Sequence, residues 1–242
     1  NNKGYNQKIF DSLQSRQFSE NNKHRVVIVG DSHAKDLINI LVESKLFSNV
    51  QFSTHQVNSE CGNLYLENYD LIEKHIPIKK LERCKFLGWY QGETFNKILS
   101  EADEIWLASS WHLWVIDHLP KSIRRLSNQF SVPIRVFGLK NFGEVSPYKM
   151  LSIPSEQRVT YTQVIKKSTV EIAETLNRTL SQYDLFYPLL QPLCGGNHLE
   201  CKVFTSEGLL MSSDGGHLTR EGAVESANRL SVMLNAISNS LK

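Results

Sequence analysis

The apolar positions of the chain fall into short β-branched runs separated by segments with helical spacing. The first run is Val26 to Val29, and an unbroken strand of this kind is typical of a parallel sheet that is buried on both faces. Gly30 then lets the chain turn sharply, and the spacing that follows predicts a helix from Ala34 to Phe47. The polar residues Asp31 to His33 thus lie between a strand's carboxyl end and a helix amino terminus, where open α/β sheets collect ligands and chemistry.

The same alternation of strands and helices continues to the end of the chain. Further strands are expected at Asn49 to Thr54, Asp103 to Ser110, Ile134 to Gly138 and Leu185 to Leu190. Strands separated by helices predict a parallel sheet with right-handed crossovers. The expected fold class is therefore α/β, a three-layer α/β/α sandwich with a mostly parallel five-stranded sheet.

The pattern also predicts two long helices and a hairpin. Glu156 to Tyr183 reads as one amphipathic helix, and Cys201 to Asp214 resembles a short hairpin. A final helix follows with Thr219 as its N-cap. Its apolar positions step by three and four, at Ala227, Leu230, Leu234, Ile237 and Leu241.

Composition narrows the class of protein. Of the 242 residues, 40% are hydrophobic, which is enough to bury the core of one domain. The net charge of +2 comes from 27 basic and 25 acidic residues without a long run of one sign, so no nucleic-acid partner is expected. The longest apolar stretch, Ile105 to Ile116, contains polar residues and is too short to span a bilayer.

The beginning of the chain is expected to be a lead-in. Residues 1–24 are rich in Asn, Gln and Ser around a weak helical pattern, and they precede a single domain of residues 25–242. The sequence starts at Asn1 without an initiator Met or a signal segment. We therefore expect a mature form or a piece cut from a larger protein.

Four cysteines indicate an oxidising compartment. The most local of the three possible pairings joins Cys61 to Cys84 and Cys194 to Cys201, and two short-range disulfides are typical of proteins outside the cytoplasm. Four reduced, buried thiols are one alternative. A metal site is another, because Cys194, His198 and Cys201 have the spacing of ligands, but no fourth ligand is adjacent. We expect neither a metal nor a cofactor.

A second polar segment, "SSDGGHLTREGA", precedes the last helix. Asp214 lies three residues before His217 in it, close enough to accept a hydrogen bond from one imidazole nitrogen and to leave the other free for a hydroxyl proton. Ser32 is the candidate for that hydroxyl. In a three-layer fold the loop before the last helix can return to the carboxyl edge of the sheet, which would assemble Ser32, His217 and Asp214 from opposite ends of the chain.

The two blocks "GDSH" and "DGGH", at Gly30 to His33 and Asp214 to His217, resemble those of the SGNH or GDSL-type hydrolases, which have a flavodoxin-like fold. The form "GDSHA", the cysteine pairs and the segment "ASSWHLW" are most similar to SGNH domains that are fused to bacterial membrane acyltransferases. The resemblance implies that Ser32 is the nucleophile, His217 the general base and Asp214 its orienting partner.

The resemblance also implies a setting and partners. Such domains O-acylate surface polysaccharides, including lipopolysaccharide, on the periplasmic side of the inner membrane, to which the full-length protein is tethered. The expected partners are an acyl donor, usually acetyl, delivered by a membrane acyltransferase domain of the same chain, and an oligo- or polysaccharide acceptor. The segment itself is not expected to cross a membrane.

One family block departs from the pattern. The third block, GxND, supplies an oxyanion-binding Asn, whereas the equivalent stretch here is Ser109 to His112 with Trp111 in the place of Asn. The N–H groups of Ser32 and Gly62 are the remaining candidates for an oxyanion hole. Either one of three side chains supplies the missing donor, namely Asn63, Asn141 or the indole of Trp111, or the enzyme is slow towards water.

Substrate contacts are expected close to these groups. Trp111 and Trp114 are candidates for stacking on a sugar, although tryptophans at such positions are more often core residues. Asn141 and His33 are the polar candidates. His112, His118 and His198 are interpreted as surface or structural residues.

Three other functions share these residues. A carbohydrate O-acetylesterase would use the same acyl-enzyme with water as the acceptor. A metallophosphoesterase would use Asp31, His33, His198 and His217, but the block that supplies its bridging aspartate is missing. A glycan-binding module with a relict triad is the non-enzymatic alternative.

Overall fold

The five predicted strands form one parallel sheet in the computed structural model, which describes residues 2–19, 22–195 and 199–242. The strand order is β2-β1-β3-β4-β6, and each neighbouring pair is parallel. The strands are β1 (His24–Gly30), β2 (Val50–Gln56), β3 (Glu104–Ala108), β4 (Ile134–Phe137) and β6 (Phe186–Tyr187). The chain runs outward from β1 to β2 and then returns to the other side of β1, so the order reverses between β1 and β3. In open α/β sheets such a switch point marks the usual ligand site, outside the carboxyl ends of the strands.

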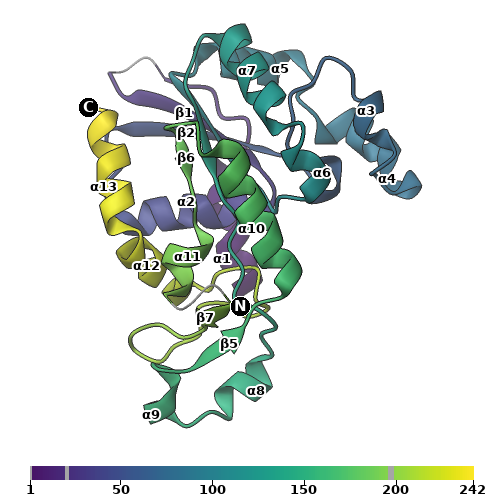
Figure 1. Ribbon diagram of the computed structural model, residues 1–242. Helices are drawn as coiled ribbons and strands as arrows, with labels where there is room; N and C mark the ends of the chain where they lie inside the picture. The colour runs from purple at the N-terminus through teal and green to yellow at the C-terminus, as the bar shows by residue number, and fades with distance from the viewer. Residues whose placement is uncertain (1, 20–21, 196–198) are drawn as a thin grey trace.

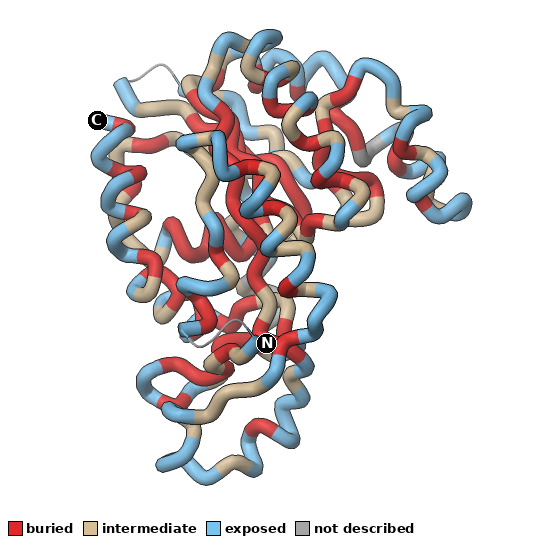
Figure 2. The backbone as a smooth tube through the Cα atoms, in the orientation of Figure 1, coloured by how far each residue is buried: buried red, intermediate tan, exposed pale blue. Residues whose placement is uncertain are grey.

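Helices cover both faces of this sheet (Figure 1). One face carries α1 (Asn2–Ser12), α2 (Ser32–Ser44), α12 (Arg220–Arg229) and α13 (Ser231–Ser240). The other carries α5 (Glu93–Glu101), α7 (Leu119–Phe130) and α10 (Lys167–Leu180). The side chains of β1 alternate between the two cores: Val26 and Ile28 pack toward α2, and Val27 and Val29 toward α5 and α7. Figure 2 shows the strands as the most continuously buried part of the chain. The three-layer α/β/α class is thus confirmed.

Short elements fill the connections. They are η1 (Ser59–Cys61), α3 (Asp70–Glu73), α4 (Ile78–Arg83), η2 (Cys84–Gly88), α6 (Leu113–Ile116), α8 (Pro147–Leu151), α9 (Ser155–Arg158), β5 (Thr162–Val164), α11 (Leu190–Cys194) and β7 (Glu200–Lys202). β5 and β7 form a separate antiparallel pair. Figure 1 shows this pair with α8 and α9 at one end of the molecule, beyond the edge of the main sheet.

Three predicted elements differ in the structure. The single helix over 156–183 is wrong: α9, β5 and α10 divide it, because Thr162–Val164 pairs with β7. The last helix is two helices, α12 and α13, which meet at Leu230. The predicted hairpin over 201–214 is reduced to one antiparallel bridge between Phe204 and Leu210, because β7 pairs with β5 instead.

The predicted lead-in packs against the domain. α1 lies on α2, and the Phe10 side chain is fully buried in the core of that face. Tyr5 donates a hydrogen bond to Glu43, and Lys35 forms an ion pair with Asp11. This segment therefore contributes to the layer that holds α2 in place.

Both predicted disulfides are formed. Cys61 is bonded to Cys84, and Cys194 to Cys201. Such bonds are typical of an extracytoplasmic location. In the described part of the chain, no helix combines the length and apolar character needed to cross a membrane.

Candidate active site

The turn after β1 is built by a glycine and an aspartate. A Cβ on Gly30 would lie 1.7 Å from the carbonyl oxygen of Ala108 in β3, so only glycine fits this close approach. Asp31 is the N-cap of α2, and its carboxylate accepts the N–H of His33 at 2.8 Å. The other oxygen accepts the N–H and the hydroxyl of Ser110, which follows β3. Asp31 therefore joins the carboxyl ends of β1 and β3.

Ser32 occupies the first position of α2. Its N–H is one of the unpaired donors of the helix amino terminus, where the dipole favours negative charge. Within the part of the chain that the structure describes, no hydrogen bond joins the Ser32 hydroxyl to His217. Catalytic hydrogen bonds are often long before substrate binds, so the missing contact does not contradict the role of Ser32. The assignment of Ser32 as the nucleophile stays a prediction.

Asp214 and His217 form a close pair at the amino side of α12. His217 Nδ1 lies 2.6 Å from Asp214 Oδ2, and Asp214 Oδ1 accepts the N–H groups of Gly216 and His217 at 2.8 Å. Partial burial would raise the pKa of the Asp214 carboxyl, but these hydrogen bonds outweigh it and lower the pKa to about 2. The carboxylate is thus ionised near neutral pH, which assigns the imidazole proton to Nδ1 and leaves Nε2 as an acceptor.

The loop with His217 is attached to the helix that begins at Ser32. Asp36 accepts the N–H of Leu218 at 3.2 Å, and its carboxylate pairs with Lys140 Nζ at 2.5 Å. Lys140 also donates a hydrogen bond to the carbonyl of Gly216. Since Ser32 and Asp36 are one helical turn apart and share a face of α2, the 214–218 loop lies on the side of the helix that carries Ser32.

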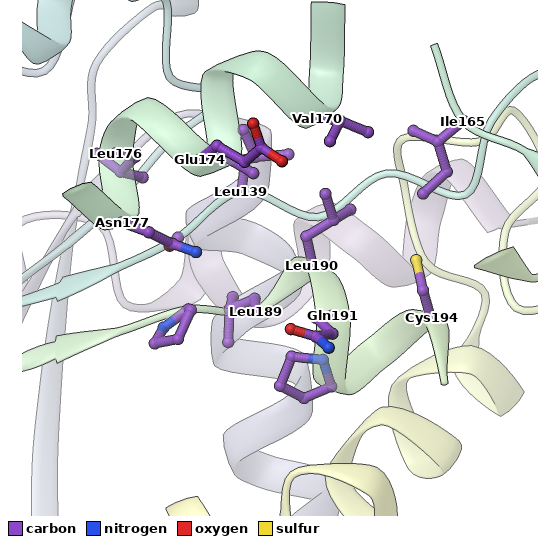
Figure 3. Close-up of a pocket in the computed structure, with 14 residues that line it drawn as sticks. Leu139, Ile165, Val170, Glu174, Leu176, Asn177, Leu189, Leu190, Gln191 and Cys194 are labelled. Carbon is purple, nitrogen blue, oxygen red and sulfur yellow. The ribbon is translucent and has the colours of Figure 1, made fainter. Parts of the chain in front are cut away.

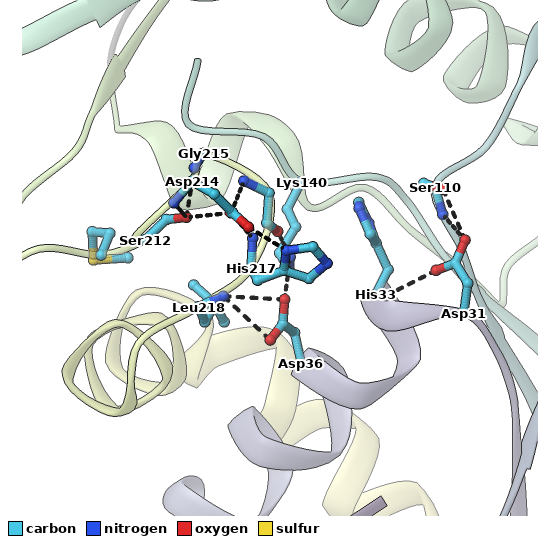
Figure 4. A network of polar contacts seen from close by, with 12 residues as sticks. Asp31, His33, Asp36, Ser110, Lys140, Ser212, Asp214, Gly215, His217 and Leu218 are labelled. Carbon is cyan, nitrogen blue, oxygen red and sulfur yellow. Dashed lines mark hydrogen bonds and ion pairs between the residues drawn. The ribbon is translucent and has the colours of Figure 1, made fainter. Parts of the chain in front are cut away.

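His33 lies beside the same loop. Figure 4 shows the His33 ring between the ring of His217 and the carboxylate of Asp31. The Nδ1 atom of His33 is buried without a hydrogen-bond partner in the described structure. Burial lowers the pKa of His33 well below its ordinary value, and the charges of Lys140 and His217 add to this effect. His33 is therefore neutral at physiological pH.

The structure places two of the three candidate oxyanion donors in the core. Both amide hydrogens of Asn63 are used, one by the carbonyl of Val29 and one by Ser109 Oγ. The indole N–H of Trp111 donates to the carbonyl of Phe137 at 2.8 Å. These side chains tie loops to the carboxyl ends of β1 and β4, and neither has an N–H left for an oxyanion.

The backbone N–H of Gly62 and the side-chain amide of Asn141 make fewer or weaker hydrogen bonds than the donors of Asn63 and Trp111. The Gly62 N–H makes only a long bond of 3.5 Å to the carbonyl of Ser59, and its φ of 66° suits glycine. Asn141 Oδ1 accepts the N–H of Gly143, and no described residue accepts a hydrogen bond from Asn141 Nδ2. Asn141 directly follows Lys140, whose side chain contacts the loop with His217.

The two tryptophans have different environments. Trp111 is 3% exposed and belongs to the core, so it has no face open to a sugar. Trp114 is partly exposed, lies against Gly62, and stacks in parallel with His75 and His112, whose ring centroids are 5.2 and 6.0 Å from its own. Of this pair, only the Trp114 side chain is accessible to solvent.

Metal chemistry has little support at these residues. Cys194 and Cys201 are consumed by their disulfide, and His198 lies outside the described residues. Both oxygens of Asp31 are engaged by backbone N–H groups and a hydroxyl. Asp31, the first residue of the phosphoesterase alternative, is thus occupied by structural contacts.

A cavity of about 310 Å³ lies apart from these groups, between α10 and α11. Figure 3 shows Val170, Glu174 and Asn177 on α10 facing Leu190 and Gln191 on α11. Its lining includes none of the predicted catalytic residues.

Two residues of the polar network, Asp36 and Lys140, were not among the site residues predicted from the sequence. Asp36 lies four positions after Ser32, and a helical pattern places it on the same face. Lys140 follows the carboxyl end of a predicted strand. Position was therefore an available signal for both, although charged residues at such positions are usually solvated.

The chain was compared with known proteins. No family model and no curated protein matches it. Among solved structures it is similar to a "possible lipase" from Chitinophaga pinensis DSM 2588, with 13% sequence identity, coverage of 90% of this chain and 99% of that chain, and a TM-score of 0.43. A likeness this distant carries no argument about activity, so any function rests on the residues described above.

Proposed function

We propose that this chain transfers an O-acyl group, usually acetyl, to a carbohydrate hydroxyl through an acyl-enzyme on Ser32. The observation that carries the proposal is the Asp214–His217 pair, whose loop is attached to α2 one turn from Ser32. A serine at a helix amino terminus beside an Asp-oriented imidazole has the parts of a nucleophile, a base and an orienting group.

In the first half-reaction, Ser32 Oγ attacks the acyl carbonyl carbon of the donor and passes its proton to His217 Nε2. The bond between the acyl carbon and the leaving group then breaks, and His217 returns the proton to the leaving group. Asp214 stabilises the imidazolium that forms between these steps. The acyl group remains as an ester on Ser32.

The oxyanion needs donors at the helix amino terminus. The Ser32 N–H is unpaired there, and the Gly62 N–H is the second backbone candidate. Asn141 Nδ2 is the one predicted side-chain donor that the core leaves free. We assign the place of the family's missing Asn to Asn141.

In the second half-reaction, a sugar hydroxyl gives its proton to His217, and its oxygen attacks the acyl carbon. The bond between the acyl carbon and Ser32 Oγ then breaks, and His217 returns the proton to Ser32 Oγ. Trp114 is the proposed platform for the sugar ring, with neutral His33 as a polar contact. In this proposal the step takes place in the periplasm, a membrane acyltransferase domain of the same chain delivers the donor, and a surface polysaccharide is the acceptor; the resemblance of the sequence blocks supports this setting.

Esterase activity is the second candidate, favoured by the exposure of the site. The His217 side chain is 42% exposed and that of Asp214 52% exposed, so water reaches the general base in the absence of an acceptor. A hydrolase and a transferase would share the first half-reaction and differ only in the molecule that takes the acyl group.

The test is hydrolysis of an acetyl ester by wild type, Ser32→Ala and Ser44→Ala, with and without EDTA. Ser44 lies at the opposite end of α2, so its substitution is the matched control. The proposal predicts that Ser32→Ala loses activity, that Ser44→Ala keeps it, and that EDTA has no effect. Inhibition by EDTA would indicate a phosphoesterase-type metal site, and a wild type that only binds glycan would indicate a binding module.

A further inference from the structure

The ion pair between Asp36 and Lys140 has no place in the chemistry of the triad. Its side chains are 0% and 2% exposed, and Lys140 Nζ lies 2.5 Å from Asp36 Oδ2. Burying two charges costs desolvation free energy, and apolar side chains of the same volume often give equal or greater stability. Stability alone therefore does not explain why this pair stands here.

The contacts of the pair converge on the loop that carries His217. Asp36 accepts the N–H of Leu218, the residue after His217, while Lys140 donates to the carbonyl of Gly216, the residue before it. The two backbone groups that flank His217 are thus held from both sides. Figure 4 shows the contacts between Asp36 and Leu218.

The pair also fixes this loop relative to the nucleophile. Asp36 belongs to α2, whose first residue is Ser32, and Lys140 follows β4. Among the described residues, the hydrogen-bond partners of Asp214 lie in its own loop, at Ser212, Gly216 and His217, so Asp214 orients the imidazole without attaching the loop to α2. Orientation and placement are thus supplied by different carboxylates.

We propose that Asp36 and Lys140 are positioning residues for His217, and that their ion pair sets the separation between the imidazole and Ser32. This inference rests on the proposed function. Misplacement of a catalytic group by about 1 Å typically costs on the order of 100-fold in rate, because the reacting atoms must meet in a near-attack geometry. The pair should therefore affect kcat and leave acceptor or ester binding nearly unchanged.

The test replaces the pair by apolar residues, as Asp36→Leu with Lys140→Met, so that no buried charge is left unpaired. The matched control is Glu104→Leu with Arg135→Met. That pair is also buried, with the Glu104 side chain 7% and the Arg135 side chain 5% exposed, but it joins β3 to β4, and within the described structure none of its hydrogen bonds reaches the 214–218 loop. Asp36→Asn is a third variant, which keeps an acceptor for Leu218 and loses the charge.

Two readouts are measured on variants shown to be folded by circular dichroism. The first is ester hydrolysis, for which we expect kcat to fall about 100-fold in the Asp36/Lys140 double variant with KM nearly constant, and by a smaller factor in Asp36→Asn. The control pair should keep a kcat close to that of wild type. The second is deuterium exchange of the backbone at 216–218, which should accelerate in the Asp36/Lys140 variant alone.

The outcomes separate the two claims. If wild type hydrolyses esters, Ser32→Ala does not, and the Asp36/Lys140 variant keeps the wild-type kcat, the positioning role is wrong and the proposed function stands. An equal loss of kcat in the control pair would likewise overturn it, because the effect would then be one of general stability. If wild type has no activity on esters, the proposed function and the positioning role both fail, and the exchange measurement still decides whether the pair holds the loop.

Discussion

The imidazole of His217 is oriented by a carboxylate three residues before it, with Nδ1 2.6 Å from Asp214 Oδ2. The other oxygen of the same carboxylate accepts the backbone N–H of His217, so Asp214 fixes the ring and the chain that carries it. This pair is solvent-accessible, whereas the Asp36–Lys140 pair beneath it is buried. The Asp214 contact sets the tautomer of the His217 imidazole, and the Asp36–Lys140 pair is proposed to set the position of that imidazole relative to Ser32.

Asp214→Asn should lower kcat by about 10⁴-fold, because an amide does not hold the Nδ1 proton as a carboxylate does. Ser32→Ala should lower it further, and combining Ser32→Ala with His217→Ala should add little, since residues that act as a unit are not additive. Steady-state kinetics with an acetyl ester measure these ratios. Equal kcat values for Asp214→Asn and wild type would remove Asp214 from the triad.

Acid should destabilise the protein between pH 6.5 and about 4 because of His55. Its ring stacks on Phe95 at 3.6 Å, both ring nitrogens are buried without partners in the described structure, and burial lowers its pKa to about 4. The unfolded chain binds a proton below the ordinary pKa of about 6.5 while the folded chain stays neutral, so stability present above pH 6.5 is lost as pH falls toward 4.

His55→Phe is the variant that isolates this effect, because it keeps the stacked ring and removes the titration. Between pH 7 and pH 4, the free energy of unfolding of wild type should fall by about 3 kcal/mol more than that of the variant. Urea unfolding at the two pH values gives both differences. Parallel losses in the two proteins would contradict the assignment to His55.

Reduction of the disulfides should lower stability. On a chain-entropy estimate, Cys61–Cys84 with a separation of 23 residues contributes about 3.4 kcal/mol and Cys194–Cys201 with a separation of 7 contributes about 2.4 kcal/mol. Urea unfolding of the double Cys→Ser variants of each pair measures the two terms. Peptide mapping without reductant should find these two pairs, and four free thiols or a cross-pairing would refute the expectation.

Much of the fold can be predicted from the sequence, because local patterns of apolar and capping residues determine most of its strands and helices. The unbroken run Val26 to Val29 predicts a central strand and becomes β1, and Thr219 caps α12 by accepting the N–H of Gly222, as its position before the helix predicts. The predicted helix over 156–183 failed because β5 exists only through its pairing with β7, a partner some 40 residues away whose proximity no local pattern reveals.

The site divides in the same way. The Asp214–His217 contact spans three residues and follows from their spacing. The donors of Asn63 and Trp111 are taken by the carbonyls of Val29 and Phe137, which are distant in the sequence, so their commitment to the core appears only in three dimensions. The pairing of Asp36 with Lys140 was hidden for the same reason.

Trp114→Ala should weaken the effect of a sugar acceptor more than basal hydrolysis. With the correct oligosaccharide, wild type should consume acyl donor faster and yield O-acylated sugar, because a bound hydroxyl is better oriented than water. Stacking of the sugar on the indole is expected to contribute roughly 1 kcal/mol to acceptor binding, so its loss should reduce this acceleration about fivefold. The exposed Tyr148 on α8 provides the control, as Tyr148→Ala. Rapid hydrolysis with no response to any carbohydrate would favour the esterase over the transferase.

The central claim is that the acyl group passes through Ser32, and direct detection of the acyl-enzyme tests it. Wild type and Ser32→Ala are incubated with an activated acetyl ester, quenched in acid and digested, and the peptide that contains Ser32 is examined by mass spectrometry. The account predicts one acetyl group on Ser32 in wild type and none on that peptide in Ser32→Ala. Turnover of the ester at the wild-type rate by folded Ser32→Ala would contradict it.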